Sequence, residues 1–247
     1  MEIWAFKTEL PTLTGAPSLC CRVACLPAFY GTIPGVKVSV LLPAAGSGER
    51  IGRGPKAFLK VDEKTLLEWV LEGFAWADEI IVALPKGFED TGLSVLTVPG
   101  GATRQQSVCN LVQVATGEIV LVHDVARPFV VRAAVERLLS EVRTSGAATL
   151  AVPVPDTLVQ EQSGRYGAVI PREHHRLVQT PQGFRREVLL QAHLKARVEG
   201  LEFTDDAQLV RWQGHPVALV EGDRRMFKIT YPEDLLLAEG LARVWNS

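Results

Sequence analysis

A run of small residues that ends in cations is the part of this 247-residue sequence best suited to chemistry. Residues 43–56 read Pro-Ala-Ala-Gly-Ser-Gly-Glu-Arg-Ile-Gly-Arg-Gly-Pro-Lys and follow directly on the apolar run 38–42. Small residues after a strand let backbone N–H groups approach phosphate oxygens, and Arg50 and Lys56 add positive charge there. The run lacks the Gly-Lys-Ser/Thr ending of a Walker A loop and the Gly-x-Gly-x-x-Gly spacing of dinucleotide-binding folds. It predicts a polyphosphate site, although an ordinary strand-to-helix turn would share its glycines.

The elements that would position this loop follow from the spacing of apolar residues after Val36. Short apolar runs alternate with segments of helical spacing, which predicts a mostly parallel, Rossmann-like sheet with helices on both faces, a three-layer α/β/α fold. Ligands bind such sheets beyond the carboxyl ends of the strands, where the loop at 43–56 lies. We expect strands over 38–42, 79–84, 94–98, 119–122, 147–152 and 217–220, and helices over 65–76, 103–114, 131–142, 185–198, 205–212 and 232–244.

Two segments depart from this alternation. Residues 1–36 carry scattered prolines and glycines without helical or strand periodicity, so we expect a poorly ordered N-terminal extension before a single domain over 37–247. Between Pro153 and Pro181 short β-prone pieces are separated by glycines and prolines, which predicts a protruding β-arm over about 154–180. The exposed strands of such an arm favour a partner subunit that covers them.

Composition and charge exclude several classes of protein. A net charge of −2 lacks the basic excess of proteins that bind nucleic acid or membrane surfaces by bulk electrostatics, so neither is an expected partner. No apolar run is long enough to cross a bilayer. The cysteines are Cys20, Cys21, Cys25 and Cys109, a distribution that forms no disulfide framework and fits a reducing compartment, the cytoplasm. We interpret Cys109 as a small core residue of a helix.

Further segments make the resemblance to a known family specific. In chain order, the loop at 43–56 and these segments resemble the 2-C-methyl-D-erythritol 4-phosphate cytidylyltransferase family, which belongs to the non-mevalonate isoprenoid pathway. The resemblance covers the chain from about Val38 to its C-terminus. The segments are Gly100–Val108, Val122–Pro128, Pro153–Thr157, Gln179–Gln182, Phe203–Asp206, and Val220–Gly222 with Phe227–Thr230.

The resemblance implies a fold of the nucleotide-diphospho-sugar transferase type and a Mg²⁺-dependent transfer of CMP from CTP to methylerythritol phosphate, with release of pyrophosphate. The residue types are compatible with that chemistry. The acceptor is a phosphomonoester whose second pKa is about 6, so it is already anionic near neutral pH and needs no general base. Accordingly, the sequence shows no nucleophile elbow and no convincing Ser-His-Asp or Cys-His set. Positive charge around the α-phosphorus is what the reaction requires.

The resemblance also implies roles for individual residues, namely those of this sequence that lie at matching positions of the family's motifs. Arg50 and Lys56 are expected to stabilise the transition state, and Arg172 and Lys228 to position the substrate phosphate. In the family the arm residue matching Arg172 reaches the other subunit's site, so a homodimer with exchanged arms is implied. We expect CTP contacts from Pro43, Ala44, Ala45, Gly46, Ser47, Gly48, Gly101 and Ser107, and contacts to the phosphorylated polyol from Asp124, Arg127, Thr157, Thr180 and Thr204.

Asp124 and its neighbours have further expected roles. Asp124 follows a strand at its carboxyl end and suits Mg²⁺, whereas His123 points to the opposite face and is expected to be structural. Of the acidic pair Asp205 and Asp206, we interpret Asp205 as the motif member that begins a helix. Ala102 stands where the family commonly has an acidic residue.

Two alternatives stay open. A ribitol-5-phosphate cytidylyltransferase would keep nearly every motif. A catalytically silent nucleotide-binding module would be expected to lose Arg50, Lys56 or Asp124, and all three are present.

Overall fold

The computed structural model describes residues 35–46, 54–88, 92 and 95–245, and the remaining residues lie outside the description. Backbone contacts divide the chain into two units, Met1–Tyr30 and Gly31–Ser247. The first unit lies wholly outside the described residues, so the expected extension over 1–36 stays a prediction.

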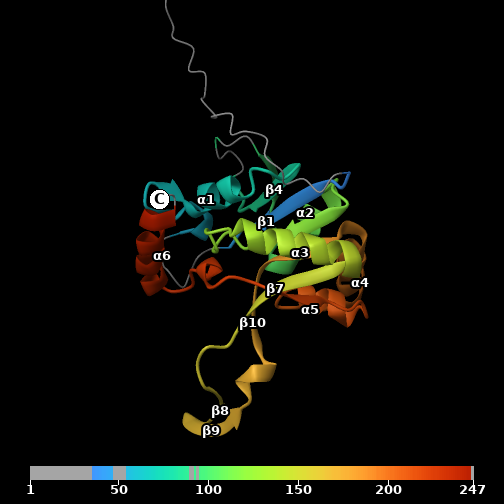
Figure 1. Cartoon of the computed structure of the whole chain (residues 1–247). Coiled ribbons are helices and arrows are strands. Elements are labelled where there is room, and N and C mark those ends of the chain that lie inside the picture. Colours follow the sequence, from blue (N-terminus) through green and yellow to red (C-terminus); the bar gives the residue numbers. More distant parts are fainter. Residues whose placement is uncertain (1–34, 47–53, 89–91, 93–94, 246–247) are drawn as a thin grey trace, which may run out of the picture. The chain divides into compact units, whose positions relative to one another are not determined.

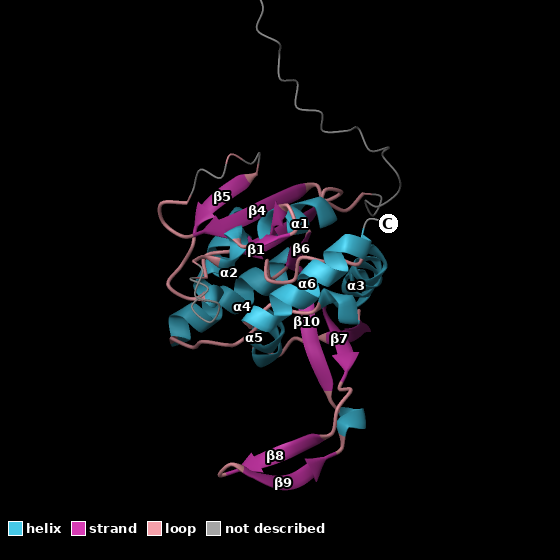
Figure 2. Cartoon of the chain, turned by 90° about the vertical axis from the view of Figure 1, so that its left-hand side faces the viewer, coloured by secondary structure: helices cyan, strands magenta, loops and turns pink. Residues whose placement is uncertain are grey.

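A seven-stranded sheet forms the centre of this unit, in the order β11-β7-β10-β6-β1-β4-β5 (Figures 1 and 2). Six strands run in the same direction, and β10 alone is antiparallel to both of its neighbours. The mostly parallel sheet is therefore confirmed. The strands are β1 (Val38–Pro43), β4 (Glu79–Leu84), β5 (Leu96–Pro99), β6 (Ile119–Val122), β7 (Ala147–Pro153), β10 (Arg176–Arg185) and β11 (Ala218–Glu221).

Helices cover both faces of the sheet because its central strands are apolar on both sides. Along β1, Val40 and Leu42 pack in one core, while Leu41 between them packs in the other. The first core includes residues of α1 (Leu66–Gly73), α3 (Arg132–Ser145) and α6 (Pro232–Trp245). The second includes residues of α2 (Arg104–Val114), α4 (Arg186–Glu199) and α5 (Asp206–Trp212). The predicted three-layer fold is confirmed.

Local signals set the helix ends. Thr65 caps α1 in a capping box with Glu68, and the left-handed Gly146 ends α3. The helix expected over 65–76 stops at Gly73, where an added Cβ would lie 2.7 Å from Cβ of Val130. Shorter elements complete the unit, namely η1 (Lys56–Phe58), β2 (Lys60–Val61), β3 (Lys64–Thr65), η2 (Arg172–His174) and η3 (Arg224–Met226).

Strand β10 corrects the sequence analysis, which assigned its first residues to the arm and gave it no place in the sheet. β10 lies between β6 and β7, and its register against β7 shifts between Val178 and Gln182. Pro181 lies within that shift and has no N–H to donate. A strand is predicted from alternating apolar and polar residues, and the proline and the irregular register interrupt that alternation. For this reason β10 was not predicted.

The β-arm itself is present as a hairpin of β8 (Leu158–Gln162) and β9 (Arg165–Ile170). Its turn residues Ser163 and Gly164 both have positive φ, as a tight hairpin turn requires. The two strands pair with each other and with no other strand that the structure describes, and Figures 1 and 2 show them apart from the main sheet. Tyr166 and Val169 are 72% and 60% exposed, so the arm presents apolar side chains to solvent.

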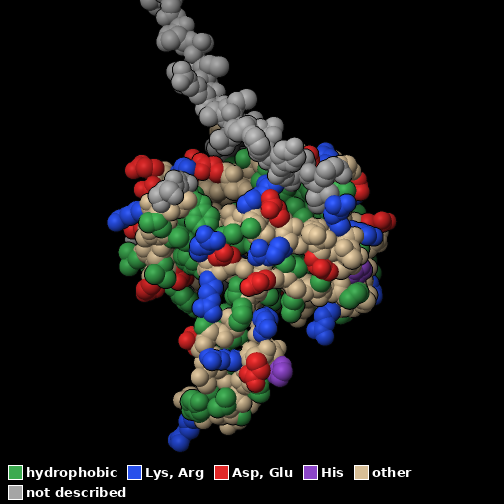
Figure 3. All heavy atoms as spheres, viewed as in Figure 1, with side chains coloured by type: hydrophobic (Ala, Val, Ile, Leu, Met, Phe, Trp, Pro, Cys, Tyr) green, Lys and Arg blue, Asp and Glu red, His purple; other side chains and the backbone are tan. Residues whose placement is uncertain are grey.

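The surface in Figure 3 mixes basic and acidic side chains without a continuous face of one sign, in keeping with the small net charge. None of the described helices combines the length and the apolar character that a membrane crossing needs.

Candidate active site

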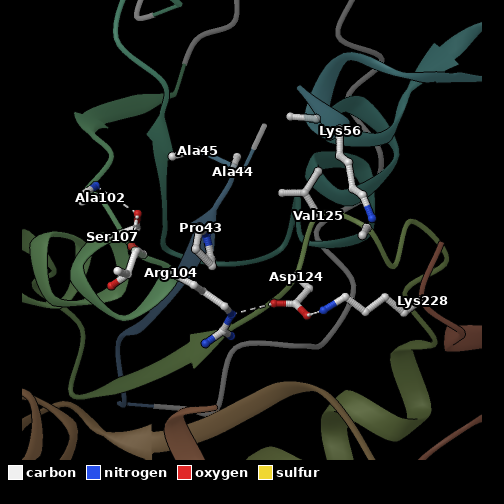
Figure 4. Close-up of a pocket in the computed structure, with 15 residues that line it drawn as sticks. Pro43, Ala44, Ala45, Lys56, Ala102, Arg104, Ser107, Asp124, Val125 and Lys228 are labelled. Carbon is white, nitrogen blue, oxygen red and sulfur yellow. Dashed lines mark hydrogen bonds and ion pairs between the residues drawn. The ribbon is translucent and has the colours of Figure 1, made fainter. Parts of the chain in front are cut away.

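A pocket of about 530 Å³ lies at the carboxyl ends of the parallel strands β1, β5 and β6 (Figure 4). Among its described lining residues there are three cations and one carboxylate, so the pocket carries net positive charge. It has the place and charge that the sequence analysis expected for a polyphosphate site. Its lining residues are Pro43, Ala44, Ala45, Gly46, Lys56, Ala57, Gly101, Ala102, Thr103, Arg104, Ser107, Asp124, Val125, Ala126 and Lys228.

The first wall of the pocket consists of the small residues after β1. The amide of Ala44 donates to the carbonyl of Ala83 at 2.9 Å, and the amide of Gly100 donates to the carbonyl of Leu84 at 2.8 Å. A Cβ on Gly100 would lie 2.2 Å from Cβ of Ala45. The two loops therefore approach each other as closely as small residues allow. Ala44, Ala45 and Gly46 line the pocket, and their expected contacts to CTP stay a prediction.

The second wall is the turn between β5 and α2. Ser107 Oγ accepts the amide of Gly101 at 3.0 Å and donates to the carbonyl of Thr103, also at 3.0 Å. One acceptor position remains on this hydroxyl, since an oxygen of this kind accepts twice and donates once. The amide of Ala102 donates to Gln106 Oε1, so the backbone at this position is engaged without an acidic side chain. Thr103 is the N-cap of α2, and its side chain accepts the amide of Gln106.

Two lysines that are far apart in the sequence line the same pocket. Lys56 Nζ donates to the carbonyl of Ile229 at 3.1 Å, and Lys228 Nζ donates to Asp124 Oδ2 at 2.7 Å. The amide of Ile229 in turn donates to the carbonyl of Ala126 at 2.8 Å, which holds the C-terminal segment beside the loop after β6. The structure therefore brings together the motifs that contain Lys56, Asp124 and Lys228 (Figure 4).

Asp124 is the carboxylate of the pocket, and cations hold both of its oxygens. Oδ1 accepts from Arg104 Nε at 3.1 Å, and Oδ2 accepts from Lys228. Burial alone would raise the pKa of Asp124, but the positive charges of Arg104 and Lys228 hold that pKa well below its usual range. Asp124 is therefore ionised at any physiological pH and orders the two cations beside it.

Behind Asp124 lies a buried polar chain. Thr180 Oγ1 accepts the amide of Asp124 at 3.0 Å and lies 3.3 Å from Nδ1 of His123, while Nε2 of that ring lies 2.9 Å from the carbonyl of Arg127. Burial lowers the pKa of His123 to about 4, so the ring is neutral at pH 7. A structural His123 is confirmed. Thr180 is absent from the lining of this pocket, and its hydroxyl contacts the Asp124 backbone.

Arg104 is the site residue that the sequence analysis missed. It lies inside the motif Gly100–Val108 but was given no role, and its side chain lines the pocket beside Asp124 (Figure 4). Its Nη1 also donates to Asp206 Oδ2 at 2.8 Å. Burial would lower the pKa of Arg104, yet the charges of Asp206 and Asp124 raise it above its ordinary value. The sequence held no local signal for this contact, because Asp206 belongs to a separate motif 102 residues away.

A second, smaller pocket of about 300 Å³ adjoins the first and shares Lys228 with it. Its lining is mostly apolar and includes Arg127, whose Nη1 donates to the carbonyl of Met226 at 2.7 Å. The Nε of Arg127 is buried with no hydrogen-bond partner in the described structure. Arg127 therefore lines the smaller pocket next to the charged one, and its expected contact to the phosphorylated polyol stays a prediction.

Other predicted site residues lie elsewhere. Thr204 is exposed at the start of α5 and donates to Gln208 Oε1, so it does not line either pocket. Thr157 and Arg172 are exposed on the arm, outside both pockets, and Arg172 donates to the carbonyl of Pro155. Ser47, Gly48 and Arg50 lie outside the described residues, so their expected contacts stay predictions.

The described side chains contain no group of three or more His, Cys, Asp or Glu residues suited to a metal ion. Asp124 is the one carboxylate among the described lining residues, and each of its oxygens already accepts one N–H. A carboxylate has about four acceptor positions in all, so Asp124 could add a cation. One carboxylate together with substrate phosphates is a usual ligand set for Mg²⁺. The donor set therefore fits an ion that arrives with a polyphosphate.

Comparisons with known proteins agree with this geometry. Residues 38–243 match the family model described as 2-C-methyl-D-erythritol 4-phosphate cytidylyltransferase. The chain is 58% identical over 213 residues to the protein of that name from Thermus thermophilus, covering 86% of this chain and 100% of the relative. It is 48% identical over 207 residues to the Deinococcus radiodurans protein of that name, covering 83% of this chain and 89% of the relative.

Solved structures show the same likeness. The crystal structure of the Thermus thermophilus protein superposes with a TM-score of 0.78 at 56% identity, covering 84% of this chain and 100% of that chain. The Francisella tularensis cytidylyltransferase superposes with a TM-score of 0.72 at 30% identity, covering 83% and 99%.

Proposed function

Because this chain belongs to the 2-C-methyl-D-erythritol 4-phosphate cytidylyltransferase family, we propose that the charged pocket is where it transfers CMP from CTP to methylerythritol phosphate. The activity itself follows from the family and serves isoprenoid biosynthesis. The observation that carries the assignment of the pocket is the meeting of Lys56, Arg104, Asp124 and Lys228 at the carboxyl ends of the strands.

The reaction is a single displacement at phosphorus. A phosphate oxygen of methylerythritol phosphate forms a bond to the α-phosphorus of CTP, and the bond from that phosphorus to the bridging oxygen of the β-phosphate breaks. Pyrophosphate leaves with the electron pair. Since the attacking phosphate is already an anion, the pocket requires no residue that removes a proton, and His123 is buried and hydrogen-bonded away from the pocket lining.

The cations of the pocket supply what this displacement needs. Negative charge spreads over the oxygens of the α-phosphorus in the transition state, and fixed cations stabilise it there. Lys56 faces this charge, and Lys228, held by Asp124, meets the acceptor phosphate where the two pockets join. Arg50 adds a further cation from the same loop as Lys56, and Arg127 lines the acceptor side.

The small residues and the turn at Gly101 would receive the rest of CTP. Backbone amides after β1 suit the triphosphate, and the remaining acceptor position of Ser107 Oγ suits the amino group of cytosine. Asp124, together with phosphate oxygens, would hold Mg²⁺. When bound, this ion neutralises charge on the triphosphate and favours departure of pyrophosphate.

We further propose a homodimer in which arms are exchanged. Thr157 and Arg172 lie on the arm and outside the pockets of their own chain, where they have no substrate to contact. The exposed Tyr166 and Val169 give the arm an apolar surface that a second copy would cover. Arg172 of each arm would then position the acceptor phosphate in the site of the other subunit.

The cytoplasm is the proposed location. The supporting observation is the cysteine usage, with a buried, unpaired Cys109 and no spacing of a disulfide framework in the sequence.

The assignment is tested by pyrophosphate release with CTP and each of two acceptors, methylerythritol phosphate and ribitol 5-phosphate. We expect turnover with methylerythritol phosphate, with CTP alone as the blank and the mass of the CDP-alcohol as the second readout. Turnover with ribitol 5-phosphate alone would show that the acceptor is ribitol 5-phosphate and not methylerythritol phosphate. CTP binding without turnover of either acceptor would make the chain a silent nucleotide-binding module.

A further inference from the structure

Asp206 is a charged side chain buried where no substrate can reach it. The residue is 1% exposed, is the first residue of α5, and is absent from the linings of both pockets described above. A buried carboxylate is unfavourable unless cations and hydrogen bonds compensate it, and well-packed apolar residues often stabilise a fold as much or more. Its presence therefore calls for a role other than stability.

The contacts of Asp206 lead to the active site through one side chain. Its Oδ2 accepts from Arg104 Nη1 at 2.8 Å, and its Oδ1 lies 3.3 Å from Nε2 of the buried His193. The Nε of the same guanidinium donates to Asp124 Oδ1 at 3.1 Å, and the other oxygen of Asp124 accepts from Lys228. Asp206, Arg104, Asp124 and Lys228 thus form one continuous chain of ion pairs.

The geometry of Arg104 explains why two carboxylates are needed. A guanidinium is a planar fork, so fixing one edge sets the direction of the other N–H groups. Bound to Asp124 alone, Arg104 could turn about that contact and point toward the incoming triphosphate. Bound at Nη1 by Asp206 as well, it presents Nε to Asp124, which keeps the Asp124 carboxylate turned toward Lys228.

We propose that Asp206 is a positioning residue for CMP transfer, because it orients Arg104 and thereby the pair of Asp124 and Lys228 beside the acceptor phosphate. The proposal rests on the proposed function of the pocket. The position of Lys228 relative to the reacting groups matters because a misplacement of about 1 Å can lower a rate about 10²-fold.

The test is a double-mutant cycle on the full-length enzyme with kcat, both KM values and thermal unfolding as readouts. The variants are D206N, R104A and the double variant, and D205N is the matched control. Asp205 caps the same helix from a neighbouring position by accepting the amide of Gln208, and asparagine preserves that cap.

We expect D206N to lower kcat about tenfold or more, with a smaller change in either KM, and D205N to keep the wild-type rate. In the R104A background, D206N should change kcat by less than about twofold, because a residue that acts through Arg104 has no effect once Arg104 is gone. An equal fall in both backgrounds, a wild-type kcat for D206N, or an equal fall for D205N would each overturn the proposal.

R104K keeps the inference testable if D206N does not fold. Its ammonium retains the charge but cannot bridge two carboxylates as a planar fork, so we expect kcat to fall about tenfold or more. A wild-type kcat for R104K would refute the proposal. An inactive wild-type enzyme would instead refute the proposed function, so the two failures are distinguishable.

Discussion

Gly101 is where the shape of the proposed CTP pocket can be tested by adding one carbon atom. A Cβ on this residue would lie 2.3 Å from Cβ of Gln106, 2.9 Å from the carbonyl carbon of Gln106 and 3.0 Å from the amide nitrogen of Ser107. Carbon atoms pack at about 3.5 Å or more, so the turn and the start of α2 must separate by about 1 Å in G101A. These neighbours are backbone or near-backbone atoms, so no flexible side chain can move aside instead.

The displacement acts on the segment that forms the second wall of the pocket. Because Ser107 accepts the amide of Gly101, moving the turn also breaks or strains that hydrogen bond. We expect G101A to lower kcat/KM for CTP about 10²-fold and the free energy of unfolding by about 1–3 kcal/mol.

Pyrophosphate release at varied CTP and thermal unfolding measure the two effects in G101A. The matched control is G240A in α6, where an added Cβ meets nothing within 4 Å. This control should keep the wild-type kcat/KM and gain about 0.5–1 kcal/mol, because alanine favours a helix interior. If G101A folds and keeps the wild-type kcat/KM for CTP, the turn does not form the nucleotide site as argued.

Three further predictions follow from other parts of the structure. K56M, which keeps an unbranched side chain and removes the charged terminal nitrogen, should lower kcat about 10²-fold. A wild-type kcat for K56M would show that Lys56 does not stabilise the transition state. Burial lowers the pKa of His123 to about 4 from its ordinary 6.5, so between these two pH values the ring is protonated in the unfolded state and neutral in the folded state. As the pH drops from 6.5 to 4, the free energy of unfolding should therefore fall by about 3 kcal/mol more in wild type than in H123Q. Denaturant titration at each pH measures this, and an equal fall in both proteins would contradict it. Mixing the inactive R172A and K228M enzymes should restore pyrophosphate release through hybrid dimers if Arg172 acts in the other subunit, whereas mixtures without activity would place it in its own subunit.

Most of the sheet could be predicted because its parallel strands are buried on both faces and read as short apolar runs. The strand at 119–122 and the N-cap at Thr103 appear where their residue types place them. β10 could not be predicted in this way. Pro181 and the register shift interrupt its alternation, and its antiparallel pairing with β6 and β7 is a long-range property that local pattern does not contain.

The candidate site shows the same division between local and long-range information. Lys56, Gly101, Ser107, Asp124 and Lys228 belong to segments that resemble motifs of the family, and the structure places all five around one pocket. The contact between α2 and α5 was missed, since nothing local in either motif links an arginine to an aspartate 102 residues away. Thr180 and Thr204 do not line the pocket of the described chain, where the first supports Asp124 and the second faces solvent, because a motif shows that a residue is near a site without showing where its side chain points.

The stereochemical course at the α-phosphorus tests the central claim most directly, namely that the substrate's own phosphate displaces pyrophosphate without a protein nucleophile. The measurement uses a single diastereomer of CTP in which sulfur replaces one nonbridging oxygen of the α-phosphate, so that the α-phosphorus is chiral. The configuration at this phosphorus in the CDP-alcohol product is determined by phosphorus NMR. A single displacement predicts inverted configuration. Retained configuration would require two successive displacements through an enzyme-bound nucleotide and would contradict the account.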